Sequence, residues 1–202
     1  MRFTYFLSAF LATLTIASPI SSGADVTESI SLVTRDTEKQ TDEYKAALKA
    51  HAGLQKDQYY YFFQKDNLGA KILDSDAETL TELEQLQKNL GFEHIGVIVG
   101  QVTEVTVGKT GKKTTTKDFK ATYYHMTKDK KNNVMGHGPN WKASLVDFSK
   151  STLVYGGQTN KKGVDNAKKN SKDYLAEADH KTYDIGKNNC NTYAQAVAQA
   201  FK

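Results

Sequence analysis

The pattern of apolar and polar positions predicts helices and strands that alternate along the first half of the chain. Residues 36–52 carry acids early and Lys and His late, and Gly53 follows them, which predicts a helix. The aromatic run at 58–63 predicts a strand. Residues 75–90 begin with a capping-box pattern and repeat leucine at helical spacing before Gly91, which predicts a second helix.

A long β-hairpin is predicted next. Residues 92–107 are β-branched and alternate between apolar and polar, the sequence GKTGKK turns the chain, and residues 114–127 return as a second strand. The GKT in this turn lacks the glycine spacing of a phosphate-binding loop, and no helix follows it. We therefore interpret it as a hairpin turn.

The rest of the chain predicts a loop, a strand and two helices. The loop covers residues 128–141 and the strand covers 145–154, while helical spacing covers 164–178 and about 190–201. A short extended piece, 183–185, precedes the last helix. The predicted fold class is α+β, with an antiparallel sheet built on the hairpin (about 92–127) and packed against helices.

The first residues have the layout of a secretory signal peptide. Residues 1–18 contain one early basic residue and a short apolar run, and small residues follow, so we expect cleavage between 17 and 24 and a secreted, extracellular protein. The apolar run is too short for a comfortable membrane span, and no later segment is suited to one. We expect an N-terminal helical segment at 25–91 and a core at 92–202, together one domain.

Composition and charge limit the classes of partner. The formal net charge is +4, and the lysines are scattered among acids or gathered in turns, which is typical of a solvated surface and not of a nucleic-acid groove. Neither a cofactor nor a metal is expected.

The single cysteine, Cys190, excludes an internal disulfide. Ala194 and Val197 follow it at helical spacing, and Asn188 or Asn189 can cap the start of this helix. The first turn of a helix has unpaired N–H groups and a partial positive charge, which stabilise a thiolate and a developing oxyanion. Cys190 would equally fit as a small buried residue of the apolar stripe, and both interpretations stay open.

A nucleophilic thiol needs a base, and the predicted hairpin carries two histidines. With a two-residue turn at 110–111, the numbers of opposed residues sum to 221, so His125 faces Gly96 and His94 lies one diagonal step away on the same face. A loop of three or five residues would place the two histidines on opposite faces. A second imidazole can orient the first beside Cys190, and no third metal ligand stands near the pair.

The other histidines and two isolated acids have no clear role in the sequence. His137 lies in the predicted loop and could border a cleft, but we interpret it as a surface residue; His180 lies in a polar context and is assigned no role. His51 is interpreted as a partly buried or surface histidine, and either Asp147 or Asp184 could orient a histidine.

These residues together resemble a known superfamily. A strand that opens with HIGV, a histidine on the next strand, and NNCNTYAQAV at the start of the last helix are similar to the circularly permuted papain-like proteins of the NlpC/P60 superfamily, in particular the lecithin retinol acyltransferase and H-Ras-like suppressor group. The family motif around the cysteine is NCEHFV. Asn189 and Cys190 match it, Tyr193 is an aromatic match, and the acid and second histidine of the motif are absent.

The resemblance covers roughly residues 92–202 and implies a permuted papain-like fold. It implies that Cys190 is the nucleophile, that His94 is the general base and that His125 orients His94. The implied activity is a cysteine hydrolase or acyltransferase acting on an amide, ester or thioester carbonyl. The substrate, whether peptide, lipid or host protein, is not determined by the sequence.

A different class of function is also consistent with the sequence. The departures around Cys190 and the modest size of the chain are typical of a non-catalytic secreted effector or toxin-like binding protein with a degenerate site. We expect a monomer, with a dimer linked through the Cys190 thiol as a third possibility.

Overall fold

The computed structural model describes residues 36–72, 80–109 and 111–202 of the chain, and they belong to one compact unit. The predicted signal peptide, the polar leader and the capping-box residues before position 80 lie outside the described residues. The described residues have the mixed α+β architecture that the sequence predicted, a curled sheet packed against helices.

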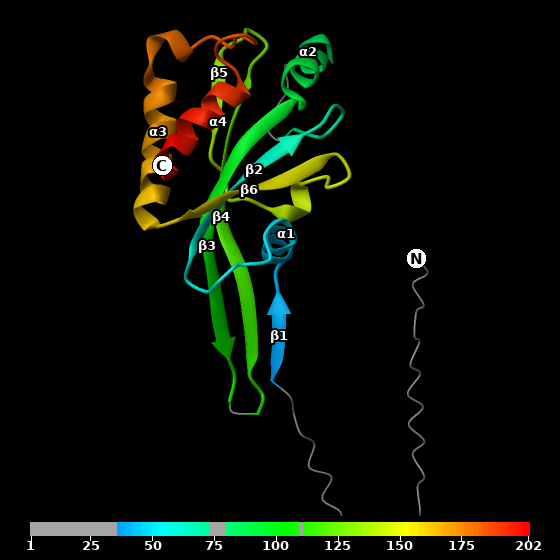
Figure 1. Ribbon diagram of the computed structural model, residues 1–202, viewed down its shortest axis with the longest axis vertical. Helices are drawn as coiled ribbons and strands as arrows, with labels where there is room; N and C mark the ends of the chain where they lie inside the picture. The colour runs from blue at the N-terminus through cyan, green and yellow to red at the C-terminus, as the bar shows by residue number, and fades with distance from the viewer. Residues whose placement is uncertain (1–35, 73–79, 110) are drawn as a thin grey trace, which may run out of the picture. The chain divides into compact units, whose positions relative to one another are not determined.

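The sheet has six strands, and all but one of its pairings are antiparallel. The strands are β1 (Thr37–Gln40), β2 (Tyr59–Asp66), β3 (His94–Val107), β4 (Thr114–Lys128), β5 (Val134–His137) and β6 (Ser151–Thr159). Their order is β1-β4-β3-β2-β6, with β5 paired to β4 near the end remote from β1. Strand β1 runs parallel to β4, along the far end of the hairpin (Figure 1).

The hairpin of β3 and β4 has the predicted register. Val97 pairs with Tyr124 and Val107 with Thr114, so opposed numbers sum to 221 along the whole ladder. At the turn, the Lys112 N–H donates a hydrogen bond to the Lys109 carbonyl at 2.8 Å. The prediction of a two-residue turn therefore gave the correct face for every side chain of both strands.

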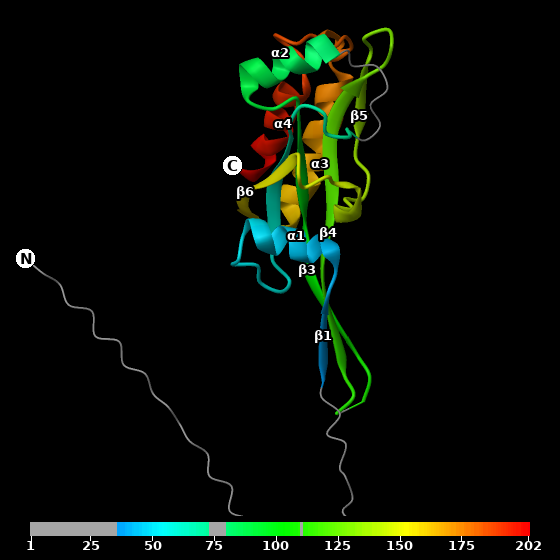
Figure 2. The ribbon, with the colours of Figure 1, turned by 90° about the vertical axis from the view of Figure 1, so that its right-hand side faces the viewer.

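Helices cover both faces of the sheet. They are α1 (Asp42–Ala50), α2 (Leu80–Leu90), α3 (Lys161–Ala176) and α4 (Cys190–Ala198), with short 3-10 turns at Ala143–Leu145, Ala178–His180 and Gln199–Phe201. Helices α3 and α4 lie side by side on one face, and α1 lies on the other (Figures 1 and 2). The buried residues of α1 and α4 belong to the cores on the two faces of the sheet, and α3 packs mainly against α4 and the 3-10 turn that follows it.

The alternation of side chains along β3 and β4 divides the core into two clusters. The α3/α4-side core includes Ile95, Val97 and Val99 of β3 with Tyr124 and Met126 of β4. The alternate positions of the same strands face α1. The buried apolar side chains of this α1-side core are Tyr44, Ala47, Tyr60, Phe62, Ile98, Val102, Phe119, Tyr123, Trp141 and Ala143.

Three segments differ from the sequence prediction. The helix expected over 36–52 begins only after Thr41, because residues 37–40 pair with β4 as strand β1. Thr41 caps α1 by accepting the Tyr44 N–H and also donates to Asp118 at 2.8 Å, which ties the start of the helix to the hairpin. The predicted loop at 128–141 contains β5, which is added to the sheet by pairing with β4.

The strand expected at 145–154 begins later, at Ser151. Residues before it form a turn in which Asp147 accepts hydrogen bonds from the N–H and hydroxyl of Ser149. The strand at 58–63 and the two C-terminal helices are present with shifted ends. Gly91 ends α2 with a φ of 81°, the left-handed conformation expected after a helix.

The two cores make a stability prediction possible. Phe119→Ala removes a ring that is 1% exposed and packs edge-on against Phe62 and Trp141, so we expect a loss of about 3–5 kcal/mol in the free energy of unfolding. Leu145→Ala, at a position 52% exposed, is the control and should change it by less than about 0.5 kcal/mol. Urea unfolding of both variants measures the difference. Equal losses in the two variants would contradict the assignment of Phe119 to the core.

Candidate functional site

Cys190 is the first residue of α4, as the sequence predicted, and Asn189 caps the helix. The Asn189 side chain accepts hydrogen bonds from the Asn191 and Thr192 N–H groups, at 2.9 and 3.2 Å. Thr192 reciprocates by accepting the Asn189 N–H at 2.9 Å, which completes a capping box. The N–H groups of the second and third residues of this helix, Asn191 and Thr192, are therefore satisfied by its own cap.

The Cys190 side chain is fully buried, with 0% of its surface exposed. It belongs to the α3/α4-side core, with Tyr193, Ala194 and Val197 of the same helix. This placement fits the interpretation of Cys190 as a member of the apolar stripe.

The structure brings His94 and His125 together. Their ring centroids are 5.4 Å apart and the rings meet edge to face. The His125 ring also stacks on Tyr123, with centroids 4.4 Å apart. Both histidines are 0% exposed, and none of their ring nitrogens hydrogen-bonds to any residue that the structure describes.

His94 and His125 lie on the α1 side of the sheet. They occupy the strand positions that alternate with Ile95 and Met126, which pack in the same core as Cys190. Successive side chains of a strand point to opposite faces, so the backbone of the sheet lies between the two histidines and the Cys190 core. The predicted catalytic group of Cys190, His94 and His125 is therefore divided between two faces, and a reaction that joins them stays a prediction.

Gly96 explains how the buried rings fit beside one another. A Cβ atom added at Gly96 would lie 2.4 Å from the Tyr123 ring and 2.8 Å from the His125 Cβ. The space above Gly96, which we expected to admit a substrate or the end of a helix, is filled by these two side chains.

We call the buried group of His94, His125 and Tyr123 the histidine cluster. It has two further members that the sequence did not predict. His137, interpreted as a surface loop residue, stacks on His125 with centroids 4.7 Å apart, and its Nε2 is 2.7 Å from the Thr127 hydroxyl. Asp66 pairs with His94 across β2 and β3 and is 2% exposed. Only the pairing of β5 with β4 and of β2 with β3 brings these residues to the cluster.

Burial determines the ionisation of the cluster. It lowers the pKa of His94 to about 3 and that of His125 to about 2, and repulsion among the histidines adds to the effect. Burial likewise raises the pKa of the Asp66 carboxyl. It also raises the pKa of Tyr123 well above its ordinary value, and electrostatic interactions with Asp66 and Cys190 add smaller increases. Both imidazoles are therefore neutral at neutral pH.

The remaining candidates lie apart from this cluster or serve the local fold. His51 stacks on Tyr155, with centroids 3.8 Å apart, and His180 stacks on Tyr174 at 3.7 Å. Asp147 and Asp184 accept hydrogen bonds within their own turns. No local pattern in the sequence favoured Asp66, because its strand partner His94 is 28 positions away.

In the part of the chain that the structure describes, no group of three or more His, Cys, Asp or Glu side chains is arranged to hold a metal ion. None of the helices in that part is both long enough and apolar enough to cross a bilayer. Searches of protein-family models, curated proteins and solved structures find no match for this chain.

The burial of Cys190 makes its reactivity testable. Alkylation by iodoacetamide at neutral pH should be at least ~1000-fold slower in the native protein than in denaturant, because the thiol must wait for local opening of the α3/α4-side core. Mass spectrometry of the Cys190 peptide over time measures both rates. A native rate equal to that of a model thiol, or faster, would instead favour an activated nucleophile.

Stability should fall on acidification because two imidazoles are buried in neutral form. The unfolded chain protonates them below pH 6.5, whereas the native state resists protonation down to about 3 and about 2. The free energy of unfolding therefore does not depend on these two histidines above about pH 6.5. Below that pH it falls by about 1.4 kcal/mol per pH unit for each histidine. The raised pKa of Asp66 offsets part of this loss, because the native state protonates that carboxyl first.

Urea unfolding between about pH 7.5 and about pH 5 measures the slope of the free energy of unfolding against pH. Two variants show which residue causes it. His125→Phe removes one titrating ring and should reduce the slope by about half. Tyr123→Phe changes the adjacent buried ring without removing an imidazole and should keep the slope. Equal slopes in the two variants would contradict the assignment to His125.

Proposed function

We propose that this chain is an exported, non-catalytic binding protein in which Cys190 and the two hairpin histidines are packed as buried residues of the core. The observation that carries the proposal is the division of the three side chains between opposite faces of the sheet, each of them 0% exposed. A thiol and its general base must lie within hydrogen-bond reach of each other and of a substrate.

The start of α4 supports the same conclusion. A helix N-terminus stabilises an oxyanion through N–H groups that are not yet used. In α4 the Asn191 and Thr192 N–H groups already donate to the Asn189 side chain. In the part of the chain that the structure describes, four surface pockets have linings that include neither Cys190 nor His94 nor His125.

Exposed apolar side chains lie at two places away from the histidine cluster, and these are the surfaces at which we expect a partner to bind. Val105 and Val107 are 54% and 61% exposed at the far end of the hairpin. Phe148 is 43% exposed and borders a groove of about 360 Å³ between α1 and the start of β6, which is also lined by Lys49 and Leu153. The proposal of export rests on the signal-peptide pattern of residues 1–18.

A thiol hydrolase or acyltransferase is the second candidate, and one observation favours it. Cys190 stands at the first position of a capped helix that packs on β3 and β4, where the family resemblance would place a nucleophile. In that function Cys190 would attack the carbonyl, and His94, oriented by His125, would transfer the proton. A rearrangement that brings His94 and Cys190 to one face would then be required.

Hydrolysis of p-nitrophenyl ester, thioester and peptide-amide substrates by wild type, Cys190→Ala and His94→Gln separates the two functions. We expect the three rates to agree within about twofold, with Cys190→Ala less stable by about 1–2 kcal/mol because a buried group is lost. A folded Cys190→Ala and a folded His94→Gln that both lose at least ~100-fold of a measurable wild-type rate would overturn the binding proposal in favour of the hydrolase.

A further inference from the structure

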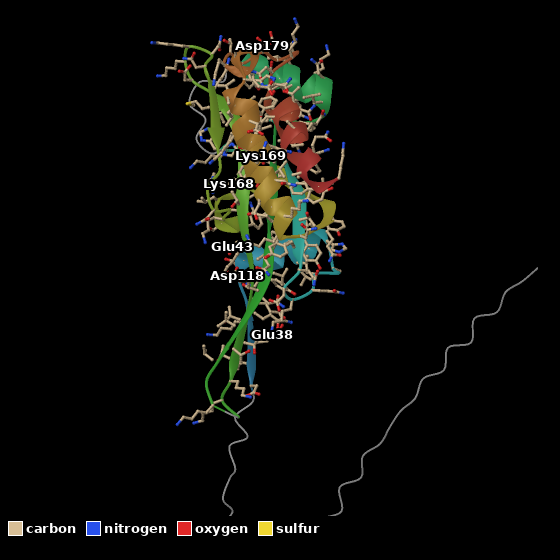
Figure 3. All side chains as sticks on the ribbon, turned by 90° about the vertical axis from the view of Figure 1, so that its left-hand side faces the viewer. Glu38, Glu43, Asp118, Lys168, Lys169 and Asp179 are labelled. Carbon is tan, nitrogen blue, oxygen red and sulfur yellow. The ribbon has the colours of Figure 1, made fainter. Side chains whose placement is uncertain are left out.

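The far end of the hairpin extends past the strand that covers the rest of β3. Pairing between β2 and β3 ends at Tyr59 and Gln101, and Val102 makes the last contacts with the chain before β2. Strand β3 continues through residues 103–107, paired on its other side with β4. We call residues 103–107, residues 114–117 and β1 the arm; Figures 1 and 2 show it extending from the body, and Figure 3 places Glu38 on it.

One edge of this arm is open in the part of the chain that the structure describes. The Val102 N–H donates to the Gln58 carbonyl at 3.0 Å, and the Val102 carbonyl accepts the Asp57 N–H at 2.9 Å, so both groups of Val102 point toward the β2 side. Main-chain groups of a strand alternate in direction, and those of Glu104 and Thr106 therefore point the same way. Beyond Val102 no described strand lies there to receive them.

The side chains of this edge do little to prevent pairing. Natural proteins commonly protect an exposed strand edge with proline, a bulge or several charges. Residues 103–107, TEVTV, have no proline, no bulge and one charge, Glu104. Val105 and Val107 are both more than half exposed on one face of the arm.

We propose that residues 103–107 pair antiparallel with the same segment of a second copy of the chain, about a two-fold axis at Val105. The open edge is present whether or not Cys190 is catalytic, so the inference does not rest on the proposed function. It replaces the monomer expected from the sequence with a weak dimer formed through main-chain hydrogen bonds.

The choice of a second copy follows from the self-complementarity of the edge. With the axis at Val105, Glu104 lies opposite Thr106 of the second copy, and four main-chain hydrogen bonds form between these two residue pairs. An axis at Glu104 would oppose two like charges and would require Val102 groups that are already bonded. An axis at Thr106 would pair Glu104 with Gly108, whose φ of 109° is incompatible with a strand.

The same register buries the exposed valines and brings opposite charges together. Val105 packs against Val105 of the second copy, and Val107 packs against Thr103. The tip of each arm then lies beside the residues before β2 of the other copy, where the exposed Lys109 approaches the exposed Asp57, whose neighbour Lys56 is also exposed. The interface is small, so we expect it to form in the upper micromolar range and to weaken with salt.

Sedimentation velocity of the purified protein from about 10 µM to about 1 mM, in reducing buffer, tests the dimer. The sedimentation coefficient should rise with concentration in wild type, and Val105→Lys with Val107→Lys should weaken association at least ~10-fold. Thr37→Lys, on the opposite edge of the arm, is the matched control and should associate as wild type does. A wild type that stays monomeric, or a dimer lost in Thr37→Lys and kept in the double variant, would overturn the proposal.

Oxidative cross-linking tests the register. Residues at a two-fold axis in a non-hydrogen-bonded pair have Cα atoms about 4.5 Å apart, close enough for a disulfide. Val105→Cys should therefore form a reducible dimer, whereas Thr106→Cys should cross-link at least ~10-fold more slowly because position 106 lies diagonal to itself. Both sites are exposed, and Cys190 is 0% exposed, so wild type serves as the uncross-linked control. Equal rates for the two cysteine variants would overturn the register and with it the proposed interface.

Discussion

The pairing of β3 with β4 in one continuous register is the constraint on which the rest of the structure depends. Eleven consecutive pairs join the strands from Val97 and Tyr124 to Val107 and Thr114, without a bulge. Because side chains alternate with a period of two, this register assigns every residue of both strands to one face. A slip of one residue in β4 would move Phe119 and Tyr123 out of the α1-side core and Tyr124 and Met126 out of the α3/α4-side core.

The register also decides the relation between the cysteine and the histidines. It places His94, His125 and Tyr123 on the face that α1 covers, while α4 packs its Cys190 stripe against the alternate positions. A buried imidazole without a hydrogen-bond partner is costly, and His94 and His125 have none among the described residues, are neutral, and lie beside a buried carboxyl. Low pH therefore favours unfolding through the histidines at the polar end of the α1-side core. The α3/α4-side core, on the other face, buries the Cys190 thiol.

Beyond the two cores the same pairing continues into solvent and becomes the arm. Here the register no longer buries both faces, and the arm is stabilised by cross-strand contacts such as the ion pair of Lys117 with Glu38, 3.0 Å long, and the hydroxyl pair of Thr37 with Thr114. Strand β1 protects the outer edge of β4, whereas no described strand pairs with the outer edge of residues 103–107. One ladder therefore serves as the centre of the core at one end and as a surface for association at the other.

The sequence by itself predicted the hairpin, the helix that begins at about Cys190 and, given a two-residue turn, the register that places His94 and His125 on one face. Each of these depends on local patterns, such as alternation, turn length and the capping of a helix by Asn189, which act between residues close in the chain or joined by one turn. The sequence also suggested the residue types of a thiol site, but not their relative positions.

Only the tertiary structure decided which face of the sheet α4 covers, and so that Cys190 and the histidines face opposite ways. It also brought Asp66 and His137 to the histidines, added β1 and β5 to β4, and left the edge at 103–107 without a partner among the described strands. The physical reason is that a strand with apolar residues on both faces can bury either face against a given helix. The choice depends on how all the helices and strands fit together, which no short stretch of sequence specifies.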